Sequence, residues 1–175
     1  MSQTVLGNNE LEEYSSASRK TQVVYQVAER FCERFSPIYL LALEDIQRII
    51  HDGRRAIIDF NLNPESSLRT RLKTLGFLQL TIEELQDEFV EFLEAKRYSR
   101  WRESSPQAMF VYRLCGSKVI SYQSCSEYVE NNNADRVANI VICMMEHVLE
   151  ELSREIHQTE RQLKRELSIT NIKKE

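Results

Sequence analysis

The sequence predicts an all-α, up-down-up-down four-helix bundle with long helices and a short helical segment inserted before the last helix. Apolar side chains recur at spacings of three and four, the period of one helix face. They are Leu68, Leu72, Leu75, Leu78, Ile82, Leu85, Phe89 and Phe92. A helix of about 28 residues is about 42 Å long, a length suited to an elongated bundle. The 175 residues include only 4 Gly and 3 Pro, too few turn-forming residues for an all-β fold.

Proline and asparagine mark the ends of the first three helices. Residues 1–17 are polar and are expected to be flexible. Apolar stripes predict a first helix at 18–35 and a second at 37–61, because Ser36 suits the N-cap and Pro37 the first helical position. Asn63 and Pro64 repeat this signature. A third helix is therefore predicted from Pro64 to about Arg97.

The last third of the chain predicts an insertion and a final long helix. Residues 98–107 read as a loop, and 108–130 as one or two short helices broken near Gly116. Asn133 suits a cap before a helix from Ala134 to about Leu167, whose charged final turns are expected to project beyond the core. The bundle domain is thus predicted at 18–168, with a flexible tail at 169–175.

Composition limits the classes of protein. A net charge of -4 argues against a strongly basic nucleic-acid binder. No apolar stretch is long enough to span a membrane, and no signal segment is visible at the N-terminus. We expect a soluble, cytoplasmic protein without membrane contact. The four cysteines have no CxxC spacing and are expected to be small buried residues in a reducing compartment: Cys32, Cys115, Cys125 and Cys143.

Patterns typical of helical-bundle enzymes are absent from the sequence. A di-iron site needs Glu-x-x-His pairs. The residues three positions before the three histidines are Arg48, Met144 and Arg154 instead. Cys143 and His147 form a single i,i+4 pair, which is too little for zinc. Nucleotide-binding and hydrolase motifs do not occur. We therefore expect a non-enzymatic protein with no catalytic residues, no metal and no cofactor.

Charged residues give two interpretations that the sequence leaves open. Six acids lie on one helix, either as a solvated outer face or as a docking face for a basic partner: Glu83, Glu84, Asp87, Glu88, Glu91 and Glu94. Basic and aromatic residues follow directly, and such mixtures hold phosphates while a ring stacks on a base. Alternatively, the basic residues complement the dipole at the C-terminus of a helix, and the Trp packs on the end of the bundle. The candidate nucleic-acid-binding residues are Arg54, Arg55, Lys96, Arg97, Tyr98, Arg100, Trp101 and Arg102.

Arg54 and Arg55 belong to a second basic group, for which there are also two interpretations. Its members straddle the turn at 61–64, so adjacent helix ends could bring them together; alternatively, they pair with Asp52, Asp59 and Glu65. The group consists of Arg48, Arg54, Arg55, Arg69, Arg71 and Lys73.

Three segments resemble a known bacterial family. They are VYQVAERFCERF, DIQRIIHDGRRAIIDF and TIEELQDEFVEFLEAKRYSRW. They are similar to the four-helix-bundle family that includes proteins encoded in 23S ribosomal RNA intervening sequences and the accessory variability determinants of diversity-generating retroelements. The final helix, VANIVICMMEHVLEELSREIHQTERQL, resembles the extended last helix of the variant with a four-helix-bundle suffix. The resemblance covers residues 21–101 and 134–163.

The resemblance implies an accessory protein that assembles as a homo-oligomer, with a ring of five expected, and binds DNA or RNA together with a reverse transcriptase. Apolar residues beside the main stripes also favour self-association. They are Val23, Leu41, Ile58, Leu80, Met145 and Leu149. The alternative is a structural bundle that docks a basic protein and binds no nucleic acid.

Overall fold

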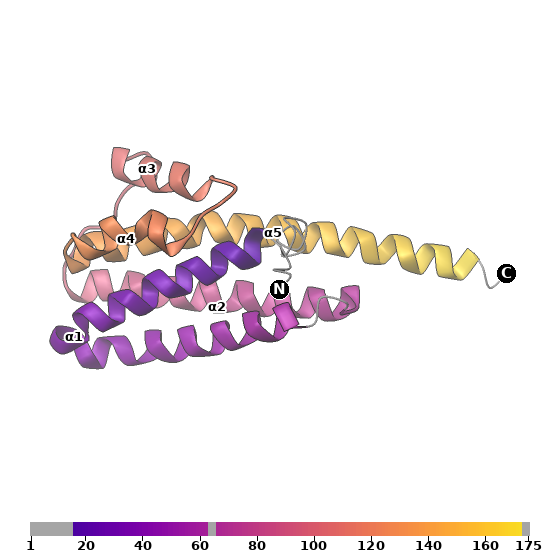
Figure 1. The fold of residues 1–175 in the computed structure, drawn as a ribbon, viewed down its shortest axis with the longest axis horizontal. Helices are drawn as coiled ribbons and strands as arrows, with labels where there is room; N and C mark the ends of the chain where they lie inside the picture. Colours follow the sequence, from indigo (N-terminus) through magenta and orange to yellow (C-terminus); the bar gives the residue numbers. More distant parts are fainter. Residues whose placement is uncertain (1–15, 63–65, 173–175) are drawn as a thin grey trace, which may run out of the picture.

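The computed structural model describes residues 16–62 and 66–172, and within these ranges no residue lies in a β-strand. The predicted all-α helical bundle is confirmed (Figure 1). The long segments run in alternating directions along the molecule, and the short helices lie beside them. The helices are α1 (Ser16–Leu62), α2 (Leu68–Ala95), α3 (Pro106–Cys115), α4 (Tyr122–Glu130) and α5 (Ala134–Ile172).

Helix α1 is a hairpin of two helical arms. The backbone leaves helical geometry at Tyr39 (φ -128°, ψ 31°), two residues after Pro37. Proline lacks an N–H and its ring clashes with the preceding turn, which breaks a helix. The predicted break is confirmed, although its centre is Tyr39 and not Ser36. We call residues 16–38 the first arm and residues 40–62 the second arm; Figure 1 shows them side by side.

Helix α2 begins later and ends slightly earlier than the sequence predicted. Ser67 is its N-cap, and its Oγ accepts the N–H of Thr70 at 3.2 Å. The predicted start at Pro64 is wrong because this later serine provides the cap; Asn63 and Pro64 themselves lie outside the described residues. At the other end, Arg97 has φ 56° and its N–H donates to Glu94 O, while the N–H of Tyr98 donates to Leu93 O at 2.8 Å. This pair of bonds is a Schellman motif, built here without glycine.

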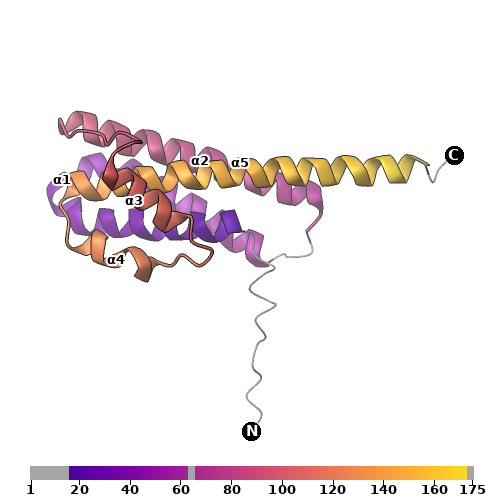
Figure 2. The ribbon, with the colours of Figure 1, turned by 90° about the horizontal axis from the view of Figure 1, so that it is seen from above.

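The core lies between α2, α5 and the two arms of α1. Most of the predicted core residues are buried, including Phe31, Leu85 and Val141 at 0% exposure, whereas Leu68 and Leu72 at the start of α2 are half-buried. Helix α3 packs on α5, and α4 packs on α1 (Figure 2). All four cysteines are buried and free. Burial raises the pKa of the Cys32, Cys115 and Cys143 thiols to about 12, so these residues are inert apolar fillers, as expected.

The ends of the bundle differ from the predicted boundaries. The first arm includes Ser16 and Ala17, and Ala17 is buried. The rest of the predicted flexible N-terminal segment, residues 1–15, lies outside the described residues, as do residues 173–175 of the predicted tail. Helix α5 continues to Ile172 and projects past the other helices (Figure 1). In the described ranges, no helix is long and apolar enough to cross a membrane.

The apolar residues expected to drive self-association differ in burial, and the side chain of Leu41 lies outside the described part of the chain. Val23 and Met145 are buried within the chain, at 5% and 0% exposure, so that part of the expectation is wrong. Ile58 and Leu80 are exposed, and Leu149 is half-buried. Val23 lies on the first arm, and its burial in the folded bundle cannot be recognised from a single helical stripe in the sequence.

Candidate nucleic-acid interface

The eight predicted binding residues lie in two separate places. Arg54 and Arg55 are on the second arm, whereas the other six follow the end of α2, where Lys96 lies over the ring of Tyr39. Tyr39 marks the kink of α1, so Arg54 is about 22 Å further along the arm at 1.5 Å per residue. The two groups therefore do not form one surface.

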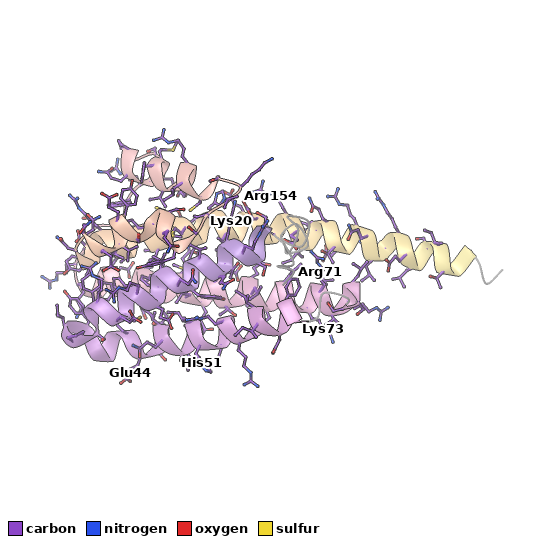
Figure 3. All side chains as sticks on the ribbon, in the orientation of Figure 1. Lys20, Glu44, His51, Arg71, Lys73 and Arg154 are labelled. Atoms are coloured by element: carbon purple, nitrogen blue, oxygen red, sulfur yellow. The ribbon has the colours of Figure 1, made fainter. Side chains whose placement is uncertain are left out.

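Three of the six residues of the second basic group form ion pairs within the chain. Arg54 forms an ion pair with Glu29 of the first arm. Arg48 pairs with Glu84, and Arg71 with Glu155 at 3.0 Å. These partners differ from the acids that the sequence suggested. Arg71 and Lys73 lie at the start of α2 (Figure 3), where the Arg71 guanidinium lies over the ring of Phe60 near the end of the second arm.

Three of the six remaining candidates are held by contacts within the chain. Lys96 Nζ is 4.8 Å from the centre of the Tyr39 ring. The hydroxyls of Tyr98 and Tyr39 are 3.0 Å apart, and this hydrogen bond, with smaller effects of burial and of nearby Tyr39 and Asp135, raises the pKa of Tyr98. Arg100 pairs with Glu146 of α5 at 2.6 Å. These contacts fix the loop after α2 in place.

Among the basic residues that follow α2, Arg97 and Arg102 remain available to a ligand. Both are exposed, and neither forms an ion pair with any described residue. The left-handed backbone of Arg97 at the Schellman turn directs the chain from α2 into the loop. The loop therefore offers two unpaired guanidinium groups on a backbone that is itself well anchored.

Asn139 anchors this loop to α5. Its Oδ1 accepts the backbone N–H of Trp101 at 2.7 Å, and its Nδ2 donates to Ser99 O at 3.0 Å. The side chain is 2% exposed, so these bonds form away from water, where a lost partner is costly. Sequence reasoning missed Asn139; the available signal was one amide inside the apolar run from Val137 to Val141.

Trp101 forms one wall of a pocket of about 480 Å³ between α3, α4 and the start of α5. Phe110 and Tyr128 form a second wall, with ring centroids 5.1 Å apart in an edge-to-face pair. The remaining lining residues are Pro106, Gln107, Val111, Leu114, Cys125, Asn132, Asp135, Arg136 and Ile140. We call this the aromatic pocket. The sequence identified Trp101 but not the other lining residues. These come from three helices and are spread over the 40 residues from Trp101 to Ile140.

Charge is strongly segregated along this part of the chain. Residues 96–121, which we call the basic insert, carry six basic residues and one acid, Glu103. The preceding stretch 83–94 carries six acids and no base. The basic residues of the insert are Lys96, Arg97, Arg100, Arg102, Arg113 and Lys118. An acidic protein thus presents one locally basic segment beside the aromatic pocket.

Another polar cluster consists of Lys20, His147 and Glu151, and its contacts hold two helices together. Lys20 and His147 both contact Oε1 of Glu151, and Lys20 is 5% exposed. Burial raises the pKa of Glu151, but hydrogen bonds and charges from Lys20 and His147 outweigh this and lower it. The cluster joins the first arm to α5. Among the described residues, no three metal-ligating side chains converge.

No family model, curated protein or solved structure matches the chain. The family resemblance therefore rests on the sequence segments alone.

Proposed function

We propose that this chain is a non-enzymatic accessory protein that binds nucleic acid through the basic insert, with the helical bundle as its scaffold. The observation that carries the proposal is the concentration of basic residues in 96–121 beside the aromatic pocket. Exposed cations bind phosphates and position a strand, while aromatic rings stack on bases.

The net charge of -4 is compatible with this role at short range. At physiological ionic strength, the Debye length is about 8 Å, so distant acids on the bundle are largely screened from a strand at the insert. Arg97 and Arg102 are the phosphate contacts we favour, because they are exposed and have no ion pair among the described residues. Arg54 and Arg100 are less suited, since each would have to leave a carboxylate.

The test measures binding of labelled single-stranded RNA and DNA by fluorescence anisotropy at several salt concentrations. The logarithm of the affinity should fall linearly with the logarithm of salt, by about 0.7 per phosphate contact on a single strand. The double variant Arg97→Glu, Arg102→Glu should weaken binding to all sequences and flatten the slope. The matched control is Arg69→Glu, Lys73→Glu at the far end of α2, which should bind normally. Absence of binding at low salt would contradict the proposal.

Self-association is a second part of the proposal. It is supported by Ile58, Phe77 and Leu80, which leave apolar surface exposed on α1 and α2. We propose a homo-oligomer, with five copies and a reverse transcriptase partner as the resemblance implies. Several weak sites on one assembly would reinforce one another. Light scattering at micromolar concentration should give a mass well above 20.6 kDa, and a monomer would reject this part alone.

The crowded acids of α2 favour an alternative, in which the bundle docks a basic protein. Burial and then the charges of Asp45, Glu91 and Glu84 raise the pKa of Glu88. A basic partner would relieve this repulsion. In this case, an Arg-rich peptide should bind the native chain, lose affinity on Asp87→Lys, Glu91→Lys, and be unaffected by the Arg97→Glu, Arg102→Glu change.

A further inference from the structure

We infer that the aromatic pocket accepts an unpaired nucleobase, with guanine preferred. This inference deepens the proposed function and rests on it for the source of the base, which would be a single strand held on the basic insert. The same base chemistry occurs in free nucleotides, so the experiment below separates the two sources.

The size and walls of the pocket suit a flat ring. Its volume of about 480 Å³ falls in the range of about 300–1,000 Å³ that is usual for small-molecule sites. Trp101, Phe110 and Tyr128 all line the pocket, and the last two form an edge-to-face pair. Phe110 and Tyr128 remain partly exposed, at 38% and 36%, so a base that stacked on them would cover apolar surface now open to water. Stacking of this kind contributes about 1–3 kcal/mol per base.

The polar residues of the pocket distinguish a base from an aliphatic ligand. Asp135 lies in the first turn of α5. Asp135, Arg136 and Gln107 all line the pocket, and none of these side chains has a hydrogen bond or ion pair with another described residue. An apolar side chain from a protein partner would bury these groups without partners, at a cost in free energy.

Guanine uses these groups best. Its Watson–Crick edge offers two adjacent N–H donors to one carboxylate, which Asp135 can accept. Its O6 and N7 atoms accept from a guanidinium, the commonest specific contact of arginine with a base, and Arg136 supplies that group. Adenine and uracil have neither an edge with two adjacent N–H donors nor an edge with two adjacent acceptors.

The pocket is preformed on the loop side. Asn139 fixes the backbone of Trp101, and Ser105 Oγ caps α3 by accepting the N–H of Ala108 at 3.2 Å. A backbone held in this way loses little entropy when a ligand binds. Asn139 is therefore a positioning residue for the pocket, whereas Trp101, Phe110 and Tyr128 would contact the base.

Trp101 is the single tryptophan of the chain, so its fluorescence reports directly on the pocket. We would titrate the full chain with GMP, AMP, CMP and UMP, and with uridine 9-mers that contain a central guanosine, a central abasic site or neither. GMP and the guanosine 9-mer should quench Trp101 most strongly, and the abasic and all-uridine strands should change the fluorescence little.

Variants test the walls and the edge separately. Phe110→Ser should weaken the affinity for GMP at least tenfold. Phe77→Ser, which changes a similarly exposed aromatic residue on α2 (46%), should leave that affinity unchanged. Asp135→Asn should remove the preference for GMP over AMP without abolishing stacking. Thermal unfolding of each variant verifies that the fold is retained.

The outcomes separate the pocket from the proposed function. If 9-mers bind by anisotropy with no guanosine preference and no Trp101 response, the base pocket is rejected while the basic insert remains a phosphate site. If GMP quenches Trp101 but no strand binds, the pocket stands and the proposed function fails. Quenching by an apolar dye but by no nucleotide would reject the base and assign the pocket to an apolar partner.

Discussion

The second half of α2 and the basic insert adjoin in the sequence but are built in opposite ways. The second half of α2 buries Leu85, Phe89 and Phe92 against α1 and α5, and its exposed residues, apart from Ala95, are acidic. In the insert, α3 rests on α5, which leaves Met109 and Phe110 partly exposed. This half of α2 thus places its large apolar residues in the core, whereas the insert leaves some of them open to water.

The largest expected effect is a charge placed in the interior of α2. Leu85 is 0% exposed, and Leu85→Asp would bury a carboxylate without a partner. The cost should be about 5 kcal/mol or more, comparable with the stability of a whole domain. Met109→Asp on α3, where the residue is 46% exposed, should change stability by about 0.5 kcal/mol or less. Urea unfolding compares the two, and equal effects would break the contrast between the regions.

The next effect concerns the hairpin of α1. A Cβ on Gly53 would overlap the ring and hydroxyl of Tyr25 on the first arm, so Gly53→Ala should cost about 1–3 kcal/mol by overpacking. Gly76 of α2 has no atom near the corresponding position. Gly76→Ala should therefore stabilise the chain by up to about 1 kcal/mol through helix propensity. The melting temperatures should move in opposite directions; a shift of the same sign would show that the arms are not closely packed there.

The anchor of the insert should be weaker than the core. Asn139→Ala leaves the N–H of Trp101 and the carbonyl of Ser99 without their partner, at a cost of about 1–3 kcal/mol. The Trp101 emission should shift to longer wavelength as water reaches its indole ring. Asn131→Ala, at an exposed turn position, serves as the control. An unchanged emission spectrum in the Asn139 variant would contradict its positioning role.

The smallest effect is a response to acid at α4. Hydrogen bonds from Arg30 and Tyr122 lower the pKa of Glu130 to about 2. Because this pKa is depressed, its stabilisation is fully present above the ordinary glutamate value of 4.5 and is lost as pH falls towards about 2. The near-ultraviolet dichroism of Tyr122 should change in this window while the helical signal persists. Glu130→Gln should remove the transition, and a transition that survives this change would have another origin.

The sequence by itself determined the helical architecture and most of the core. Spacings of three and four identified buried positions from Leu75 to Phe92, since helix periodicity is local and needs no partner to be recognised. The break near Pro37 and the start of the last helix at Ala134 were equally local. Local signals were weaker at the start of α2, which was expected at Pro64. The N-cap is Ser67, and the helix begins at Leu68.

Tertiary structure alone decided which charges are free and which aromatic residues meet. The sequence offered eight candidate residues, but only packing shows that Arg54 is paired with Glu29 and Arg100 with Glu146, whereas Arg97 and Arg102 stay open. The aromatic pocket could not be derived in advance either, because its walls come from three helices and a loop. Ion pairs and pockets depend on distances between segments far apart in the chain, and one sequence specifies those distances only once it has folded.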